Sequence, residues 1–457
     1  MKIGKERNML PEGFKARMKA MLGENYTEFE DALGKENVRA IRVNTTKIAI
    51  GDFLKKTALK LSPISYAEDG FIPESCEGIG RTAEHHAGMF YVQDPGAMAT
   101  VKALEIERGW RVLDACSAPG GKASQLASAI GDEGIILANE YVPKRAKIIV
   151  SNFERLGIKN AVITSLDTAK IGEMYEGFFD LVLCDAPCSG EGMFRKYDEA
   201  ITEWSEDNVL LCAERQREIL NNLSGTVKEG GYLLYSTCTY SKEENEDTMA
   251  NFLENHPDFE LCEVSESLRS ATADGLCGIV EARRFYPHLT PGEGQFIALM
   301  KKRKKSGNMP TILYKESVKL PAKEEITVVK KFISDNICGE ITGRIIKWGD
   351  CLALVPHDLP IPPCSVFMPG VMLGEVKKGN FFPHHQLFSA YGDRFCRKEA
   401  LTRGDERVEK YLRGEEIDAT VSENGWCAVT YEGVPLGGGK VSGGRLKNHY
   451  PKGLRNN

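Results

Sequence analysis

Two short cysteine-containing strings, each directly after an apolar run, place the strongest constraint on how this chain folds. The run FFDLVLC precedes Asp185–Gly190 (DAPCSG), and further along the run GYLLY precedes Ser236–Tyr240 (STCTY). Short apolar runs that end in turn residues are typical of buried strands. In open α/β sheets, ligands and chemistry gather beyond the carboxyl ends of strands. The two strings therefore predict two thiols that face one site.

Strand and helix patterns alternate through the middle of the chain, which predicts a mostly parallel sheet covered by helices on both faces. We expect strands at 111–114, 134–139, 161–165, 179–184, 231–235 and 295–300, and helices at 122–130, 143–156 and 207–228. With 457 residues, of which 42% are hydrophobic, the chain is long enough for several domains. The fold class is therefore α/β in this central region.

Four regions are predicted from these patterns. Residues 1–85 form a small α+β module, with a helix at 11–22 and a strand at 40–44. Residues 86–303 are the alternating α/β region. A basic, proline-containing linker near 301–323 leads into two small mixed domains, which we place at 304–375 and 376–457.

A glycine-containing loop follows the first strand of the alternating region. The loop Cys116–Lys122 (CSAPGGK) opens a helix, so its backbone amides can approach a ligand closely. The string is neither a dinucleotide fingerprint nor a Walker loop, because the required glycines are missing. Acidic residues close the next strands at Glu140, Asp167 and Asp185. One such acid is often only a helix N-cap, but several at successive strand ends suit an adenosyl cofactor without a pyrophosphate, namely S-adenosylmethionine.

The two thiols indicate covalent chemistry on an electrophilic ring. Addition of a thiolate to carbon 6 of a cytosine or uracil makes carbon 5 nucleophilic enough to attack a sulfonium methyl group. A second thiol could then assist the elimination that frees the enzyme. The alternative is that Cys188 and Cys238 are ordinary buried thiols. Their placement in polar turns after two apolar runs favours the chemical role.

Composition excludes several classes of protein. The 13 cysteines show no Cys-x-x-Cys pair, so we expect no metal, and no run of apolar residues suggests a signal peptide or a membrane span. We therefore expect a cytoplasmic protein that does not enter a membrane. A net charge of −6 argues weakly against nucleic acid, but basic residues gather at 301–305 and in the tail. The tail residues are candidate phosphate contacts: Lys440, Arg445, Lys447, Lys452 and Arg455.

The three strings together resemble the motifs of the RNA 5-methylcytosine methyltransferases of the Nop/Sun family, most closely the bacterial RsmF type. These strings are Cys116–Lys122, Asp185–Lys196 (DAPCSGEGMFRK) and Tyr235–Asn245 (YSTCTYSKEEN). The likeness extends to flanking strings along nearly the whole chain: Leu10–Phe14, Arg39–Asn44, Tyr91–Pro95, Arg284–His288, Phe382–His384 and Lys447–Leu454.

This resemblance implies a class I (Rossmann-like) S-adenosylmethionine-dependent methyltransferase core, with RNA-binding modules on both sides. The first module is the N-terminal α+β region, and the last two are RRM-like and PUA-like. The implied substrate is cytosine in small-subunit (16S) ribosomal RNA, so the implied partner is ribosomal RNA or the small ribosomal subunit. We expect a monomer. A flipped-out target base costs a few kcal/mol, which contacts made by such modules would offset.

The resemblance also implies roles for individual residues. Cys238 is the nucleophile, Cys188 aids product release, and Asp185 lies between the cofactor and the target base. The implied cofactor-binding residues are Cys116, Ser117, Ala118, Pro119, Gly120, Gly121, Lys122, Glu140, Arg145, Asp167 and Asp185. Ser117 stands where many relatives have alanine.

Three other functions remain open at this point. The substrate could be transfer RNA, with the same chemistry. The acceptor could be a protein or small molecule, which the cysteines at 188 and 238 argue against. The chain could also be a non-catalytic ribosome assembly factor, which the complete glycine loop and both thiols argue against.

Overall fold

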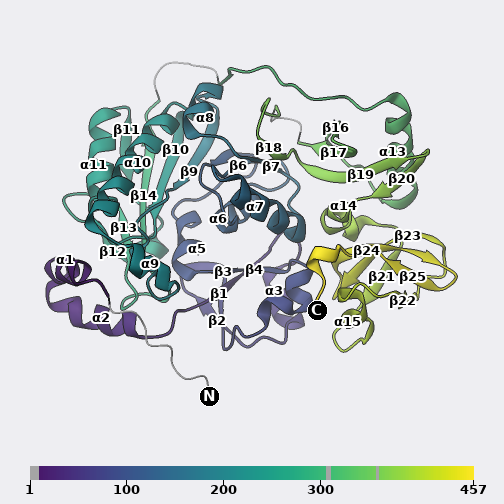
Figure 1. Cartoon of the computed structure of the whole chain (residues 1–457), viewed down its shortest axis with the longest axis horizontal. Helices are drawn as coiled ribbons and strands as arrows, with labels where there is room; N and C mark the ends of the chain where they lie inside the picture. Colours follow the sequence, from purple (N-terminus) through teal and green to yellow (C-terminus); the bar gives the residue numbers. More distant parts are fainter. Residues whose placement is uncertain (1–9, 305–309, 357–359, 457) are drawn as a thin grey trace.

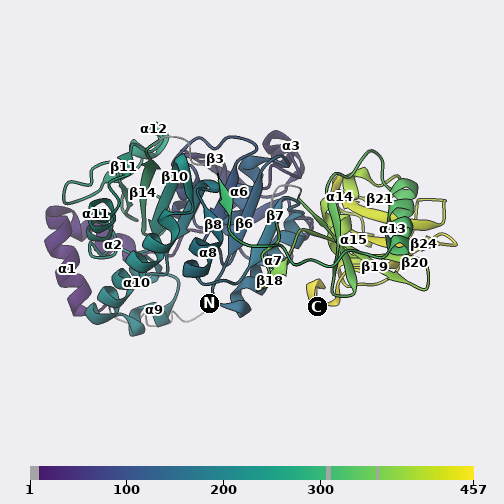
Figure 2. The same ribbon diagram turned by 90° about the horizontal axis from the view of Figure 1, so that it is seen from above.

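The computed structural model describes residues 10–304, 310–356 and 360–456 (Figure 1). Seen from above, helix α1 (Glu12–Leu22) lies at one end, a large sheet occupies the middle, and two smaller sheets lie at the other end (Figure 2). Lys305, part of the basic run, lies outside the described residues. Within those residues, no helix has both the length and the apolar character needed to cross a bilayer.

The central sheet has ten strands, and five neighbouring strands in it, from β10 to β7, are parallel. In spatial order its main path contains β12 (Ala273–Asp274), β13 (Arg283–Phe285), β14 (Gln295–Lys302), β10 (Val227–Thr237), β9 (Phe179–Asp185), β5 (Arg111–Asp114), β6 (Ile135–Asn139), β7 (Ala161–Thr164) and β18 (Val366–Met368), while β11 (Phe259–Cys262) pairs with β14. Strand order reverses between β5 and β9. Loops after these two strands therefore border the crevice in which ligands of such sheets bind.

Helices cover both faces of this sheet, as the sequence predicts. One face carries α8 (Thr168–Met174), α10 (Glu206–Ser224) and α11 (Glu246–Asn255), and the other carries α5 (Pro95–Val101), α6 (Gly121–Ile130) and α7 (Pro143–Leu156). Successive strand residues alternate between two cores because side chains of a strand point to opposite faces. Leu113 belongs to the same core cluster as Leu220 of α10, whereas its neighbour Val112 belongs to the same core cluster as Leu126 of α6.

The expected strands and helices of this region are confirmed, with one correction. The helix predicted at 207–228 ends at Ser224, and β10 already begins at Val227. Gly225 follows the last helical residue, and glycine is a poor helix former. The pairing of β10 with β9 then shifts register between Val227 and Tyr232, across the two glycines at 230 and 231. The strand is thus longer than its apolar run.

The N-terminal module contains the predicted helix and strand, and it continues past the expected boundary at residue 85. Its four-stranded sheet has the order β2 (Leu61–Ile64), β3 (Ala67–Pro73), β1 (Ala40–Val43) and β4 (Phe90–Gln93), joined by the short helices α3 (Ile50–Lys56) and α4 (Ala83–His86). Strand β4 pairs with β1 along its whole length. The sheet is therefore complete only at residue 93. Helices α1 and α2 (Tyr26–Gly34) pack Phe14 and Phe29 around Tyr240 of the cysteine string.

The linker after the central sheet packs onto the core. Strand β15 (Thr311–Ile312) pairs with β8 (Tyr175–Glu176), and the hydroxyls of Tyr314 and Tyr175 lie 3.1 Å apart. In the basic run, Lys302 donates to the carbonyls of Ser224 and Val227, and Lys301 lies over the Tyr232 ring. These two lysines therefore stabilise the fold rather than extend freely toward a partner.

A four-stranded antiparallel sheet follows, in the order β16 (Arg344–Trp348), β17 (Cys351–Val355), β19 (Val371–Lys377) and β20 (Asn380–Pro383), with helix α13 (Lys323–Asn336) before it. A sheet and a helix fit the expected RRM-like region, but the strands follow one another as a meander rather than in a β-α-β-β-α-β order. The β19–β20 hairpin also crosses the expected boundary at 375. Between β17 and β19 the chain leaves this sheet, and β18 pairs with β7 of the central sheet.

The last region has a five-stranded sheet, β21 (Lys398–Leu401), β23 (Gly425–Tyr431), β24 (Val434–Ser442), β25 (Arg445–Asn448) and β22 (Ile417–Asp418), with helices α14 (His385–Tyr391) and α15 (Arg407–Leu412). Its core is continuous with that of the N-terminal module, where Phe90 belongs to the same cluster as Tyr411. His86 Nδ1 lies 2.8 Å from the Tyr450 hydroxyl. The N-terminal module and the last region of the chain therefore pack against each other.

Candidate functional site

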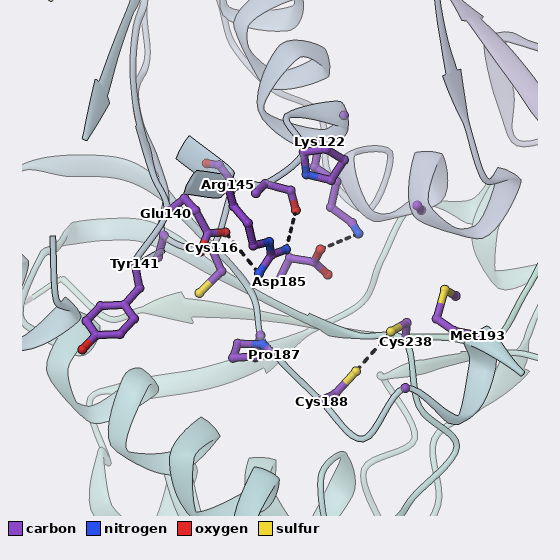
Figure 3. Close-up of a pocket in the computed structure, with 18 of the residues that line it drawn as sticks. Cys116, Lys122, Glu140, Tyr141, Arg145, Asp185, Pro187, Cys188, Met193 and Cys238 are labelled. Atoms are coloured by element: carbon purple, nitrogen blue, oxygen red, sulfur yellow. Dashed lines mark hydrogen bonds and ion pairs between the residues drawn. The ribbon is translucent and has the colours of Figure 1, made fainter. Parts of the chain in front are cut away.

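The two cysteine strings leave neighbouring parallel strands at the same edge of the sheet. Asp185 of β9 is opposite Ser236 of β10, and the loops that follow bring Cys188 Sγ to 3.1 Å from Cys238 Sγ (Figure 3). Contact with Cys238, together with burial, raises the pKa of Cys188 well above its ordinary value. The Cys188 thiol is therefore harder to ionise than an ordinary cysteine thiol.

Asp185 is held by two partners beside the thiols. Lys122 Nζ donates to Asp185 Oδ2 at 2.8 Å (Figure 3). Ser236 Oγ donates to Asp185 Oδ1 at 2.6 Å. Burial lowers the pKa of Lys122, but the charge and hydrogen bond of Asp185 outweigh this effect and raise the pKa. Lys122 is therefore a fixed cation, and Asp185 presents an ordered carboxylate to the cavity.

A cavity of about 1230 Å³ lies above the switch point between β5 and β9. All but one of the predicted site residues line it: Cys116, Ser117, Ala118, Pro119, Gly121, Lys122, Glu140, Arg145, Asp167, Asp185, Cys188 and Cys238. The exception is Gly120, where an added Cβ would lie 3.4 Å from side chains of α7. Gly120 is the N-cap residue of helix α6 and has a φ of 102°. Gly120 thus shapes the loop through its left-handed backbone.

The acids predicted to close the strands differ in their local roles. Glu140 is buried, accepts from the Val142 amide at 3.0 Å and lies 3.5 Å from Arg145 Nη1. Arg145 is exposed and also donates to the Ala118 carbonyl at 3.2 Å, so it joins the glycine loop to Glu140 (Figure 3). Asp167 caps helix α8 through the Ala169 amide at 2.8 Å. Asp167 therefore has the local role of an N-cap while it lines the cavity.

Three residues of this region are not among the predicted site residues. Asp114, at the end of β5, is 1% exposed, and neither carboxylate oxygen has a hydrogen-bond partner among the described residues. Burial, and then repulsion from Asp185, raises its pKa to about 7. Glu244 and Gln216 lie behind the Cys188 loop, bonded to each other at 2.8 Å. Asp114 directly precedes the glycine loop, so the sequence could have predicted it as a site residue. Gln216 lies in the middle of α10, and no neighbouring motif indicates that it belongs to the site.

The described part of the chain holds no group of three or more His, Cys, Asp or Glu side chains that could bind a metal ion. The residues that line the cavity instead suit an organic ligand with a cationic group. Asp114 offers a buried carboxyl group whose oxygens have no hydrogen-bond partner among the described residues, and a Cβ at Gly121 would meet the Tyr91 ring at 3.1 Å. These features fit an adenosyl cofactor that carries a sulfonium and an amino group.

The parallel sheet with its switch point, the glycine loop and the acid-bordered cavity define a class I methyltransferase. Three family models match the chain: 16S rRNA methyltransferase RsmB/F over residues 101–301, the N-terminal domain of 16S rRNA methyltransferase RsmF over 10–95, and the methyltransferase RsmF PUA domain over 398–456. Ribosomal RNA small subunit methyltransferase F of Klebsiella pneumoniae (strain 342) is 33% identical, covering 97% of this chain and 96% of its own. The chain therefore belongs to the ribosomal RNA small subunit methyltransferase F family.

Other comparisons agree with this assignment. The Vibrio vulnificus (strain YJ016) protein of the same name is 32% identical over 97% of both chains. A solved methyltransferase homologue from Pyrococcus horikoshii is 30% identical, with a TM-score of 0.55 over 64% of this chain and 95% of that one. NSun6 from the same organism, solved with the S-adenosylmethionine analogue SFG, has a TM-score of 0.57 over 65% of this chain and 99% of that one. At 22% identity, it supports the fold alone.

Proposed function

We propose that this methyltransferase transfers a methyl group from S-adenosylmethionine to carbon 5 of cytosine in small-subunit ribosomal RNA. The observation that carries the proposal is the contact of 3.1 Å between Cys188 and Cys238 in the cavity, beside the Lys122–Asp185 pair. A thiol pair at the mouth of a cofactor cavity fits covalent activation of a pyrimidine ring. Amino-group and hydroxyl acceptors need no such pair.

Cys238 is the proposed nucleophile. Its sulfur adds to carbon 6 of the flipped-out base, and the ring electrons move to carbon 5. S-adenosylmethionine, when bound, supplies the electrophilic methyl group that carbon 5 attacks. Asp185, fixed by Lys122 and Ser236, accepts a hydrogen bond from the amino edge of the cytosine.

Cys188 is the proposed release residue. After methyl transfer, carbon 5 carries both a methyl group and a proton, and carbon 6 is still bonded to Cys238. The Cys188 thiolate takes the proton from carbon 5, the electron pair of that bond restores the double bond between carbons 5 and 6, and the Cys238 sulfur leaves carbon 6 as a thiolate. Cys188 lies 3.1 Å from the leaving sulfur, and its raised pKa makes its thiolate a strong base for this step.

The cofactor would lie along the glycine loop. Residues 116–122 would offer backbone groups, Glu140 would accept from the ribose hydroxyls and Asp167 from the adenine amino group, and Arg145 contacts both Glu140 and the Ala118 carbonyl of the loop. The Asp114 carboxyl group, which also lines the cavity, would face the cationic end of the cofactor. Equilibrium binding of a sulfonium-free analogue to Glu140→Gln, with the exposed Glu173→Gln as control, tests this assignment.

The proposed RNA substrate is supported by the names of the relatives and by a basic and aromatic surface on the last domain. Lys440 Nζ lies 5.9 Å from the centre of the Trp426 ring, Trp426 lies 4.8 Å from His449, and Lys447 is the strand partner of Lys440. Two lysines and an aromatic ring suit phosphate and base contacts. Arg445 and Arg455 of the tail instead bind Asp418 and the Tyr450 carbonyl.

Residues 434–457 are unsuitable for deletion as a test of RNA binding, because β24 pairs with both β23 and β25 in this sheet. Lys440→Ala with Lys447→Ala changes the surface alone. We expect weaker RNA binding with a smaller salt dependence and unchanged cofactor affinity. Lys410→Ala, an exposed lysine of α15, is the control. Unchanged RNA affinity would remove this surface from the proposal.

Transfer RNA is the alternative substrate, and a non-catalytic role in ribosome assembly is the alternative function. The deciding experiment follows labelled methyl from S-adenosylmethionine into small-subunit ribosomal RNA, assembled subunits and transfer RNA in parallel. We expect 5-methylcytosine in a ribosomal substrate, its loss in Cys238→Ala, and its retention in Cys277→Ala, an exposed cysteine outside the cavity. Label in transfer RNA alone would change the proposed substrate, and no label in any RNA would favour the assembly role.

We further propose that the protein is a cytoplasmic monomer. Its 13 unpaired cysteines are consistent with a reducing compartment.

A further inference from the structure

The residues that directly follow the two cysteines are joined to each other. Ser189 Oγ lies 3.0 Å from Thr239 Oγ1, so the Cys188 and Cys238 loops are linked side chain to side chain one residue beyond the thiols. Both hydroxyls are buried. The distance between the two sulfur atoms is therefore set in part by this hydroxyl pair.

Each hydroxyl also contacts a buried carboxyl group. Ser189 Oγ contacts Glu244 Oε1, and Thr239 Oγ1 contacts Glu191 Oε2 at 2.9 Å. The result is a chain of four side chains, Glu244, Ser189, Thr239 and Glu191, which we call the buried relay. Glu244 and Glu191 are 0% and 1% exposed, so water cannot supply a missing hydrogen bond.

The buried relay needs one more proton than its hydroxyls provide. It contains three contacts, and each hydroxyl can donate only one hydrogen bond. If both glutamates were ionised, one contact would place two acceptors against each other in a buried site, at a cost of about 1–3 kcal/mol. One carboxyl group must therefore carry a proton.

The other hydrogen-bond partners of the two glutamates identify which glutamate carries the proton. Glu191 accepts three hydrogen bonds from neutral donors: Thr239 Oγ1 and the Tyr240 amide at Oε2, and Trp204 Nε1 at Oε1. Both of its oxygens are thus occupied as acceptors. Glu244 accepts from the Ser189 amide at 2.9 Å and from Gln216 at 2.8 Å, both at Oε2, which leaves Oε1 free to hold a proton.

We propose that Glu244 is a positioning residue that works in its protonated form, donating from Oε1 to Ser189, which donates to Thr239, which donates to Glu191. Gln216 completes the support by donating also to the Pro187 carbonyl at 3.0 Å. Glu244 thereby holds the loop that carries Cys188 against Cys238. Burial raises the pKa of Glu244 to about 7, in keeping with this assignment.

The proposal rests on the proposed release role of Cys188 and makes an asymmetric prediction. Glutamine can imitate a protonated glutamate, because its amide donates from one side and accepts from the other. We expect Glu244→Gln to release product like the wild type. Glu244→Ala should lose the support of the Cys188 loop, with a roughly tenfold slower release and a covalent enzyme–RNA adduct on denaturing gels. Glu191→Gln should be impaired, because its amide nitrogen would face N–H and O–H donors.

Glu243→Gln is the matched control, because Glu243 is adjacent in sequence but points to Arg17 and Ser241. A Glu244→Gln variant as defective as Glu244→Ala would overturn the proposal, as would normal release by Glu244→Ala. A second measurement needs no activity. The infrared difference spectrum of wild type minus Glu244→Gln, recorded below the pKa of about 7, should contain a protonated-carboxyl band. A carboxylate band there overturns the inference, whereas failure of Cys188→Ala to form any adduct would count against the proposed function alone.

Discussion

Two pairs of cysteines in this molecule have almost the same geometry and different surroundings. Cys188 and Cys238 are 3.1 Å apart in the cavity, and Cys338 and Cys396 are 2.9 Å apart on the surface. The first pair is braced by the buried relay and lies beside Lys122 and Asp185. The second pair flanks a backbone bridge between Ile337 and Phe395, and neither thiol lines the cavity. Two thiols close to each other are not sufficient for a functional site. Of the two pairs, only Cys188 and Cys238 lie beside Asp185 and Lys122 and line a cavity that can hold a ligand.

The largest expected effect comes from removing one sulfur of each pair. Cys238→Ser should lower methyl transfer at least about a thousandfold, because a hydroxyl is a far weaker nucleophile than a thiol. Cys396→Ser should change the rate less than about twofold. Initial rates of label transfer on the same RNA give the ratio. Comparable losses in both variants would abolish the distinction between the pairs.

The next effect concerns the second thiol of each pair. Cys188→Ala should lower turnover roughly 10- to 100-fold and accumulate a covalent RNA adduct, since methylation proceeds while elimination stalls. Cys338→Ala should accumulate none. Denaturing gels with labelled RNA detect the adduct. Rapid turnover by Cys188→Ala without adduct would assign release to another group.

The buried relay predicts a dependence of stability on pH that the surface pair lacks. Because the pKa of Glu244 is raised to about 7 in the folded chain, from 4.5 when exposed, its contribution is fully present below about pH 4.5 and is lost as the pH rises through 7. Glu244→Gln removes this dependence. The free energy of unfolding of the variant relative to wild type should therefore rise by about 2 kcal/mol between pH 5 and pH 8. A pH-independent difference would contradict the assignment of the proton.

Oxidation should also distinguish the two pairs of cysteines. With oxidised glutathione as the oxidant, we expect the Cys338–Cys396 disulfide to form about tenfold faster than a Cys188–Cys238 disulfide, because the surface thiols are exposed, the cavity thiols are only partly exposed, and exchange depends on access. Activity should be lost only as the Cys188–Cys238 disulfide forms, and dithiothreitol should restore it. Mass mapping of the bridged peptides at intervals measures both. Loss of activity in step with the surface disulfide would show that the two pairs are coupled.

The approach of Cys188 to Cys238 is predictable from sequence because each thiol follows an apolar run, and such runs become neighbouring strands. The glycine loop and Glu140 are predictable for the same reason. Gln216 is not, since its contact with Glu244 depends on how α10 docks against the sheet. The boundaries expected at 85 and 375 fall short of β4 and β20 because sheet pairing, rather than composition, decides where those regions end.

Strand β18 forms one edge of the central sheet, and the ribosome synthesises it long after the strand with which it pairs. It pairs with β7 although it lies about 200 residues further along the chain. At roughly 5–20 residues per second, a ribosome needs on the order of 10–40 s to synthesise that interval. Throughout this time β7 lacks its neighbour, and an open strand edge is a template for pairing with other chains. The catalytic region of this protein is therefore finished only when most of the polypeptide has been made, so its maturation is timed by translation.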